Sequence, residues 1–225
     1  MFPLSAAIQQ ELISLDGVSK VKGERFYKIY AEGDRPDYVY LLDSGLVKAS
    51  VTGRDDKEIV LSIVSPGHLF GLHGILLERA RSSHAVVLAD AVFHQIPQRS
   101  FLQYCEQRPE VWRYLAQVLA RRQGELHRKI QLLVLHDVEY RLLTSLLELA
   151  ELCGPEEPNG SVYSIPLSQE DLADIIGATR ETTSNKLNVL ARRKLLILGR
   201  RRVVISSLDA LRAALDGQSK TATVS

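Results

Sequence analysis

The chain has 225 residues, of which 45% are hydrophobic and 24% are charged, so it can bury a sizeable core as one large domain or two smaller ones. Its 28 Lys and Arg residues nearly balance its 27 Asp and Glu residues, for a formal net charge of +1; this excludes a uniformly basic nucleic-acid coat protein but leaves room for a local basic patch. No segment approaches the roughly 18 apolar residues of a membrane span, and the first residues lack the features of a signal peptide, so we expect a cytoplasmic protein without membrane contact.

Short apolar runs separated by turn-forming residues fill the segment from Phe26 to Ile96. Three of these runs, at 38–42, 46–51 and 59–64, lie between turn formers at 32–34, 43–45, 52–56 and 65–67. Two more follow at 84–88 and 91–96. Short strands at such even spacing are typical of a small barrel or sandwich. We therefore expect a β-domain over residues 1–108.

The pattern changes after Pro109, where apolar residues recur at steps of three, four and seven as far as about Leu135. Such steps indicate an amphipathic helix, which at 1.5 Å per residue would be about 40 Å long. A helix of this length usually needs a partner to cover its apolar stripe, so we expect a dimerisation helix over 109–136. The expected dimer seam comprises Val111, Leu115, Val118, Leu119, Leu126, Ile130 and Leu133. The alternative is that the stripe packs only on its own β-domain.

The rest of the chain reads as a second small domain. A helical segment over 138–152 precedes a loop at 153–161, which is rich in Gly, Pro and polar residues. We assign residues 137–216 to the C-terminal domain and expect a disordered tail over 217–225.

Two helices with a tight turn between them are predicted within the C-terminal domain. Ser168 can cap the first helix, and Asp171 suits its positive N-terminal end. Ala173 allows a close helix crossing, and Gly177 permits a left-handed turn. Thr179 can cap the second helix, which continues to about Arg192. This order of elements is the helix-turn-helix arrangement.

The second helix carries side chains that can read the edges of bases. Arg bonds guanine, Glu accepts from cytosine and Asn suits adenine, which makes Arg180, Glu181 and Asn185 the candidate base readers. Between residues 178 and 205 there are eight basic residues and one acidic residue, and concentrated positive charge is typical of contact with a phosphate backbone. Apolar runs at 195–198 and 203–205 flank a Gly-Arg-Arg-Arg turn and predict a hairpin, the wing of a winged helix. We expect duplex DNA as the partner, with phosphate contacts from Ser168, Thr179, Thr182, Lys186, Arg200, Arg201 and Arg202.

These features resemble the Crp/Fnr family of bacterial transcription regulators. The resemblance rests on the turn at 32–34, the Gly-Leu-Val-Lys at 45–48, the segment 66–71, the long helix and the segment 175–184. It implies an α+β chain with an N-terminal β-roll (a cyclic-nucleotide-binding-like jelly roll), a dimerisation helix and a C-terminal winged helix-turn-helix. It also implies a homodimer that binds a two-fold symmetric operator under control of a small effector, and that contacts RNA polymerase, mostly as an activator.

The resemblance can be carried over to individual residues of the recognition helix. Arg180 and Glu181 match two of the three base readers of catabolite activator proteins, and Glu181 and Ser184 match readers of the Fnr branch. The third reader is Arg in both branches and Asn185 here, so we expect the half-site to differ at one base pair. Thr183 and Lys186 stand where the family often has inward apolar residues, so the stem of Lys186 should follow the helix surface.

The resemblance places an effector pocket in the β-roll. Arg81 and Ser82 match the pair that holds the phosphate of cyclic AMP, and Ser83 is beside them. Leu72 stands where cyclic-AMP-binding members have a Glu, and Leu126 and His127 replace two hydroxyl residues. The absence of these polar partners argues against cyclic AMP in its usual mode and leaves the effector unknown. The expected pocket residues are Gly71, Leu72, Arg81, Ser82, Ser83, Leu126 and His127.

Two alternatives remain open. The segments 69–73, 89–90 and 136–137 also resemble the carbon-monoxide-sensing haem regulator CooA, with His73 at the position of its proximal haem ligand; haem is then the cofactor, and otherwise no metal is expected. The other alternative is a cyclic-nucleotide-type ligand-binding module that acts through protein contacts and shows no salt-dependent affinity for duplex DNA.

The sequence lacks the patterns of common enzymes. It has no nucleophile elbow, P-loop or metal-ligand spacing, so we do not expect an enzyme. Cys105 and Cys153 are far apart, and we expect both to be inert thiols.

Overall fold

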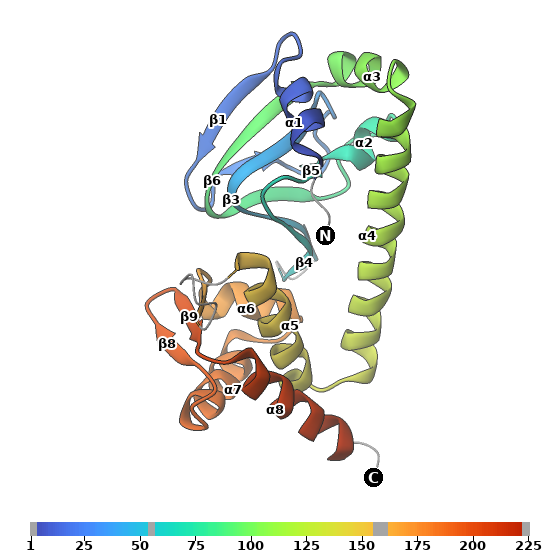
Figure 1. Ribbon diagram of the computed structural model, residues 1–225. Coiled ribbons are helices and arrows are strands. Elements are labelled where there is room, and N and C mark those ends of the chain that lie inside the picture. The colour runs from blue at the N-terminus through green and yellow to red at the C-terminus, as the bar shows by residue number, and fades with distance from the viewer. Residues whose placement is uncertain (1–3, 54–56, 155–161, 222–225) are drawn as a thin grey trace. The chain divides into compact units, whose positions relative to one another are not determined.

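The computed structural model describes residues 4–53, 57–154 and 162–221, and the chain divides into two compact units, Met1–Leu126 and His127–Ser225 (Figure 1). The expected α+β organisation, with a β-roll, a long helix and a winged helix-turn-helix, is confirmed. Within the described ranges, no helix is long and apolar enough to cross a membrane.

An antiparallel sheet forms the body of the first unit. Its central path is β1-β6-β3-β4, with β2 paired to β6 and β5 paired to β3. The strands are β1 Ser19–Gly23, β2 Lys28–Tyr30, β3 Tyr38–Thr52, β4 Glu58–Val64, β5 Leu69–Phe70 and β6 His84–Pro97.

Two pairs of predicted strands are single strands in the structure. The runs at 38–42 and 46–51 belong to β3, and those at 84–88 and 91–96 belong to β6. The residues predicted as a turn at 43–45 form an irregularity in the β3–β6 register. Gly45 has φ +84°, and a Cβ there would collide with the backbone of Asp90 and Ala91. A glycine in this segment thus serves a close strand contact, and the prediction of a turn was wrong. Part of the turn predicted at 52–56 lies outside the described residues.

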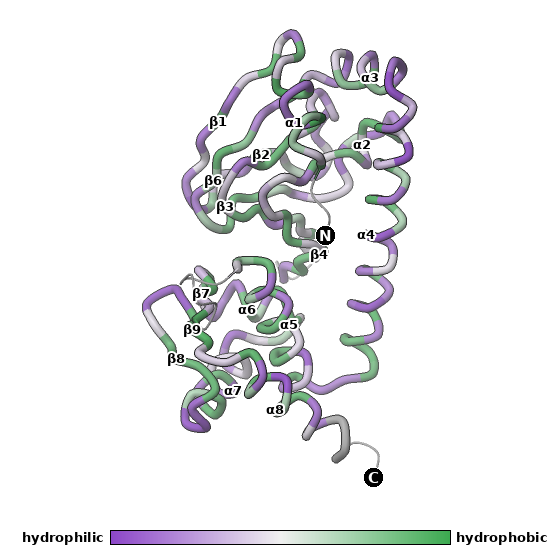
Figure 2. The backbone as a smooth tube through the Cα atoms, viewed as in Figure 1, coloured by the Kyte–Doolittle hydropathy of each residue, from purple (hydrophilic) through white to green (hydrophobic). Residues whose placement is uncertain are grey.

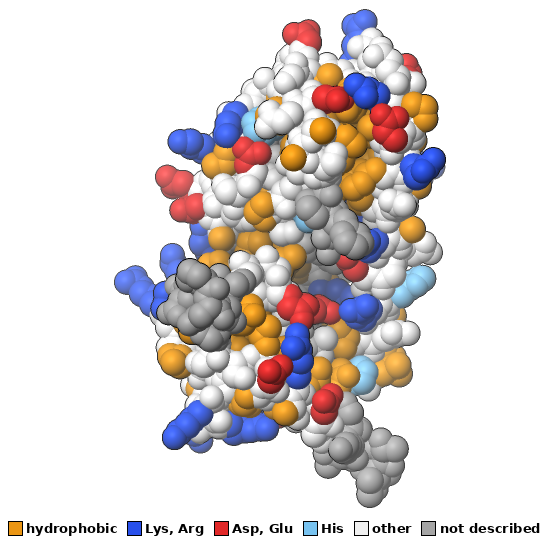
Figure 3. All heavy atoms as spheres, in the orientation of Figure 1, with side chains coloured by type: hydrophobic (Ala, Val, Ile, Leu, Met, Phe, Trp, Pro, Cys, Tyr) orange, Lys and Arg blue, Asp and Glu red, His pale blue; other side chains and the backbone are white. Residues whose placement is uncertain are grey.

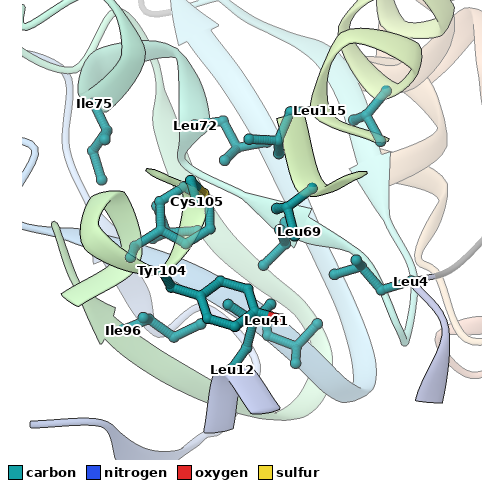
Figure 4. Close-up of a cluster of buried hydrophobic side chains, with 14 residues drawn as sticks. Leu4, Leu12, Leu41, Leu69, Leu72, Ile75, Ile96, Tyr104, Cys105 and Leu115 are labelled. Atoms are coloured by element: carbon teal, nitrogen blue, oxygen red, sulfur yellow. The ribbon is translucent and has the colours of Figure 1, made fainter. Parts of the chain in front are cut away.

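Four helices complete the described part of the first unit. They are α1 Ala6–Ile13, α2 Leu72–Leu76, α3 Gln98–Glu106 and α4 Pro109–Leu135. α4 has the predicted bounds and continues unbroken into the second unit (Figure 1). A buried cluster joins α1, α3 and the first turns of α4 to the sheet (Figure 4). Cys105 lies in this cluster, and burial raises the pKa of its thiol to about 12, which agrees with an inert thiol. Cys153, which belongs to the second unit, is half-buried.

The expected dimer seam requires a correction. Val111, Leu115 and Val118 are buried in the core of their own unit, where Leu115 points toward Leu72 (Figure 4), so they cannot face a partner. These three residues instead pack on the β-domain of their own chain, which was the alternative to a dimer seam. A different face of α4 remains exposed and apolar, and hydrophobic residues continue to its C-terminal end (Figure 2). We call this face the α4 stripe: Trp112, Leu119, Leu126, Ile130 and Val134.

The second unit packs helices against a small sheet of order β7-β9-β8. Its core contains Leu142, Leu146, Ile165, Leu172, Leu187, Leu190 and Ile205. The elements are α5 Val138–Cys153, β7 Tyr163–Ile165, α6 Gln169–Ile176, α7 Arg180–Arg192, β8 Ile197–Gly199, β9 Arg202–Ile205 and α8 Leu208–Thr221.

The predicted tail also requires a correction. α8 runs through Gly217 to Thr221, so residues 217–221 are helical and only 222–225 lie outside the described residues. The segment 208–221 contains no Pro and a single Gly, and Leu211 is fully buried, so the helix is anchored and one glycine does not end it. Most of the loop predicted at 153–161 lies outside the described residues.

Candidate nucleic-acid interface and ligand cavity

Local hydrogen bonds define the start of each helix in the predicted helix-turn-helix. Ser168 Oγ accepts from the backbone N–H of Asp171 at 3.2 Å, and the Asp171 carboxylate accepts from the Ser168 backbone N–H at 2.7 Å. This is the expected capping box at the start of α6. At the start of α7, Thr179 Oγ1 accepts from the backbone N–H of Thr182 at 3.2 Å. The predicted caps are confirmed.

The turn between α6 and α7 is held from outside the motif. Gly177 has φ +65°, and a Cβ there would lie 2.8 Å from Leu133 Cδ2. Arg141 Nη1 donates to the Ile176 carbonyl at 2.9 Å, and Lys129 Nζ donates to the Ile175 carbonyl at 2.8 Å. These two cations satisfy carbonyl groups at the end of α6. Sequence patterns did not single them out, because their partners lie more than 30 residues away.

Lys129 makes a testable contribution to the pH dependence of stability. Burial lowers the pKa of its ammonium from 10.5 to about 8, against a smaller opposing effect of Glu148. Between pH 8 and pH 10.5 the unfolded chain therefore holds more protons at this position, and the contribution of Lys129 to the free energy of unfolding rises with pH. Below pH 8 the Lys129 ammonium is charged in both the folded and the unfolded chain, so the full cost of burying this charge lowers the free energy of unfolding.

The measurement is urea unfolding of wild type and Lys129→Met at pH 7 and pH 10. We expect the stability of the Lys form relative to the Met form to improve at pH 10. A difference between the two proteins that is independent of pH would contradict the assignment.

One face of α7 is free to enter a groove. Arg180, Glu181 and Asn185 are exposed and Ser184 is half-buried, and at 3.6 residues per turn these positions share one side of the helix. The opposite side is anchored by Thr183, Leu187 and Leu190, which are buried. The structure therefore brings the four candidate base readers together on an accessible surface.

Two polar residues occupy the inward side of α7, as the family resemblance suggested. Thr183 is fully buried, and its hydroxyl donates to the Thr179 carbonyl at 2.9 Å. Lys186 is half-buried, and its ammonium lies 2.9 Å from Glu139 Oε2. Among the other expected phosphate contacts, Thr182 Oγ1 accepts from the Thr179 hydroxyl at 2.8 Å, and the Ser168 hydroxyl donates to the Asp171 carboxylate.

The predicted hairpin after α7 is confirmed. β8 and β9 pair with Gly199 opposite Arg202, so the turn holds Arg200 and Arg201, and a third arginine, Arg202, begins β9. All three are exposed, and Arg201 adopts the left-handed conformation with φ +56°. Lys and Arg side chains also gather on the surface around α7 (Figure 3). The recognition helix and the wing thus present positive charge on exposed elements.

The first unit contains a cavity of about 280 Å³ in its β-roll. Its wall includes the expected residues Gly71, Leu72, Arg81, Ser82, Ser83 and Leu126. His127 is exposed and does not line this cavity, so its assignment to the pocket was wrong; helix geometry turns it about 100° from Leu126. The apolar part of the wall comes from side chains of β4, β5 and α2, among them Leu61, Val64, Phe70 and Leu72.

Arg81 is the most tightly held cation in the cavity wall. It is 4% exposed, and its guanidinium donates to the carbonyls of Gly71 and Tyr38. The guanidinium also lies 4.3 Å from the centre of the Tyr30 ring, a cation–π contact. Its Nε is buried and has no hydrogen-bond partner among the residues that the structure describes. Arg81 therefore links the backbone at Gly71 to that at Tyr38, and it also places a positive charge in the cavity wall.

Arg122 of α4 is a second cation in the wall, which the sequence did not reveal. Its Nη2 donates to the Leu69 carbonyl at 2.7 Å, and burial lowers its pKa. Arg81 and Arg122 both oppose the rise that burial causes in the pKa of Tyr30, so the charges of both guanidinium groups act on the same phenol. Neither guanidinium forms an ion pair with a carboxylate of the described residues. The amphipathic pattern of α4 gave no signal for this residue, since an Arg on a helix is usually solvated.

His73, the candidate haem ligand, also lines the cavity. Its Nδ1 lies 3.3 Å from the Ser82 hydroxyl, and the ring is exposed. No second His and no Cys or Met belongs to the described wall.

Each of the two units contains a segment that matches a known protein family. Family models for the cyclic nucleotide-binding domain and for the Crp-like helix-turn-helix domain match residues 24–108 and 140–214. The CRP-like cAMP-activated global transcriptional regulator of Mycobacterium tuberculosis is 30% identical over 187 residues, which span 83% of this chain and 84% of the relative.

Two solved structures have the same fold. A transcriptional regulator of the CRP family from Thermus thermophilus is 26% identical with a TM-score of 0.75, over 87% of this chain and 96% of its own. A CooA mutant from Carboxydothermus hydrogenoformans has a TM-score of 0.70, over 93% of this chain and 90% of its own; at 22% identity it shows the fold alone.

The sequence match to the mycobacterial relative covers parts of both units, so that relative and this chain share the whole domain organisation and not one domain alone. The matched proteins are transcription regulators, and the exposed face of α7 has the side chains that reading a DNA groove requires. This chain belongs to the Crp/Fnr family of DNA-binding transcription regulators.

Proposed function

We propose that the protein is a homodimer that binds a two-fold symmetric operator and regulates transcription in response to a small anion held in the β-roll. The observation that carries this proposal is the exposed polar face of α7 beside a wing with three arginines. We assign effector sensing to residues 1–108, dimerisation to 109–136 and DNA binding to 137–216, and we expect the bound dimer to contact RNA polymerase.

A dimer suits both the α4 stripe and the way DNA is read. The five side chains of the stripe recur at steps of seven and four, the spacing with which two helices pack together. A dimer places two copies of α7 in successive major grooves about 34 Å apart. Arg180, Glu181, Ser184 and Asn185 would then read bases in each half-site, and Arg200, Arg201 and Arg202 would contact phosphates.

The experiment that tests the DNA-binding proposal is selection of sites from random duplexes, followed by fluorescence anisotropy on the selected sequence. We expect a palindromic motif and an affinity that falls as salt rises, because phosphate contacts release counterions. A selection that yields no motif, or binding independent of salt, would contradict it and favour a module that acts through protein contacts.

The cavity favours an anion as the effector. Arg81, which is buried, and Arg122, which is half-buried, place two positive charges in the wall against one carboxylate, that of Glu125. A buried charge is stabilised by an opposite charge. Cyclic AMP, which the name of the mycobacterial relative contains, finds Arg81 and Ser82 here but meets Leu72 where a ribose would need a polar partner. The family membership therefore leaves the effector open, and the net positive charge of the wall favours an anion.

Removing Arg81 should abolish ligand-induced stabilisation. We expect at least one member of a panel of cyclic AMP, cyclic GMP, inorganic phosphate and succinate to raise the Tm of wild type, since a ligand at one hundred times its Kd stabilises the folded state by about 2.7 kcal/mol. The same compound should not shift the Tm of Arg81→Ala. Because Arg81 also ties two carbonyls, Ser82→Ala provides a milder variant, for which we expect a reduced shift. An unchanged shift in both variants, or no shift by any compound with wild type, would contradict the anion site.

Haem sensing is a second candidate, favoured by the position of His73 in the cavity wall. His73 would hold the haem through its imidazole, and the haem would supply the iron that binds a gas. The described wall offers the iron no second His and no Cys or Met, so we prefer the small anion. A Soret band in the absorbance spectrum of the purified protein that disappears in His73→Ala would reverse this preference.

A further inference from the structure

Glu139 lies at the start of α5 and is nearly buried, with 11% of its side chain exposed. Each of its two carboxylate oxygens forms an ion pair with a different cation, one within α7 and one at the C-cap of α7. Oε2 lies 2.9 Å from Lys186 Nζ, and Oε1 lies 3.2 Å from Arg193 Nη1. The carboxylate thus bridges two cations that are seven residues apart on one edge of α7.

This edge is not the one that faces a DNA groove. Seven residues are nearly two helical turns, so Lys186 and Arg193 form one row along α7. Around the helix, Lys186 lies about 160° from Ser184, about 140° from Glu181 and about 120° from Arg180, and about 100° from its chain neighbour Asn185. The row with Glu139 faces α5. Its cations are therefore anchored to the body of the unit.

The pairing changes the charge that α7 offers to DNA. Two of the eight basic residues between 178 and 205 are bound to a carboxylate that lies far outside that segment. Lys186 and Arg193 have 37% and 47% of their side chains exposed, so either could turn toward solvent if the carboxylate were absent. Phosphate contacts raise affinity for every sequence, whereas base contacts distinguish sequences. A residue that withholds two cations therefore lowers affinity for random DNA.

We propose that Glu139 is a positioning residue for sequence recognition, which fixes α7 against α5 and withholds Lys186 and Arg193 from the phosphate backbone. Affinity then depends on the exposed face of α7 and on the wing. The assignment of Lys186 to phosphate contact, made from the sequence, is replaced by a role as the partner of Glu139.

The test compares three variants by fluorescence anisotropy on a selected operator and on a scrambled duplex between 50 and 200 mM KCl. For Glu139→Gln we expect tighter binding to the scrambled duplex and a salt slope steeper by about 0.9 for each additional phosphate that the variant neutralises. The ratio of operator to scrambled affinity should fall at least threefold. For Lys186→Met we expect the salt slope of wild type, because that ammonium does not contact DNA.

Glu151→Gln is the matched control. Glu151 lies on the same helix and also pairs with an arginine, Arg212, at 3.0 Å, but on an exposed surface, so its removal should change neither the slope nor the ratio. If Glu139→Gln lowers the Tm but leaves slope and ratio unchanged, Glu139 is only structural and the proposal is wrong. A reduced salt slope in Lys186→Met would also overturn it, and this arm does not depend on whether Glu139→Gln folds.

Discussion

Replacing Ile130 with Glu is expected to convert the protein to monomers at micromolar concentration. Ile130 is 58% exposed in the single chain and lies between Leu126 and Val134 in the α4 stripe. In a two-fold dimer built on this stripe, residues from the two copies of α4 face each other, so the substitution would bring two carboxylates into an apolar seam. Burying unpaired charges costs several kcal/mol, and each 1.4 kcal/mol weakens association tenfold. We expect the dimer Kd to rise at least a hundredfold.

Analytical ultracentrifugation checks this result, with Gln117→Glu as the control. Gln117 is an exposed residue of α4 that lies about 140° around the helix from Ile130, so it adds the same charge outside the stripe and should leave a dimer. Ile130 is also absent from the cavity wall, unlike Leu126, so a change of ligand affinity does not complicate the result. An Ile130→Glu protein that remains dimeric at micromolar concentration would place the interface elsewhere.

The elements that sequence reasoning located best are those whose signals act over a few residues. Ser168 with Asp171, the glycine at 177 and Thr179 each act within one helical turn, and the bounds of α6 and α7 follow from them. α4 was located equally well, because its pattern is repeated over many turns. The β-strands were harder. Gly45 looks like a turn residue in isolation, and only its closeness to the backbone of β6 shows that the strand continues.

The candidate sites show the same division between local and remote information. The apolar residues of α4 form two faces, one on the chain's own core and one exposed, and periodicity alone merged parts of both into one seam. Arg122 in the cavity wall and Glu139 beneath α7 were missed, because each takes its role from a partner that is distant in sequence. The four candidate base readers could be found because all lie on one helix, so helix geometry alone places them together.

Replacing Glu181 with Ala is expected to relax discrimination at one base pair of each half-site, by about 1–3 kcal/mol per half-site. Glu181 is exposed in the first turn of α7, where a recognition helix meets base edges, and a carboxylate can accept from a cytosine amino group. Because the proposed operator has two half-sites, the effect on the dimer should be about twice as large. Site selection with the variant should therefore return a motif that is degenerate at one symmetric pair of positions.

Arg200→Ala provides the complementary variant, since this exposed wing residue should contact a phosphate. We expect it to weaken all sequences alike and to reduce the salt slope by about 0.9 for each phosphate that the variant no longer neutralises, with the selected motif unchanged. Glu151→Ala removes the same charge as Glu181→Ala from the exposed side of α5 and should leave both motif and slope as in wild type. An unchanged motif in Glu181→Ala, or an altered base preference in Arg200→Ala, would show that α7 and the wing do not divide base reading and phosphate contact between them in this way.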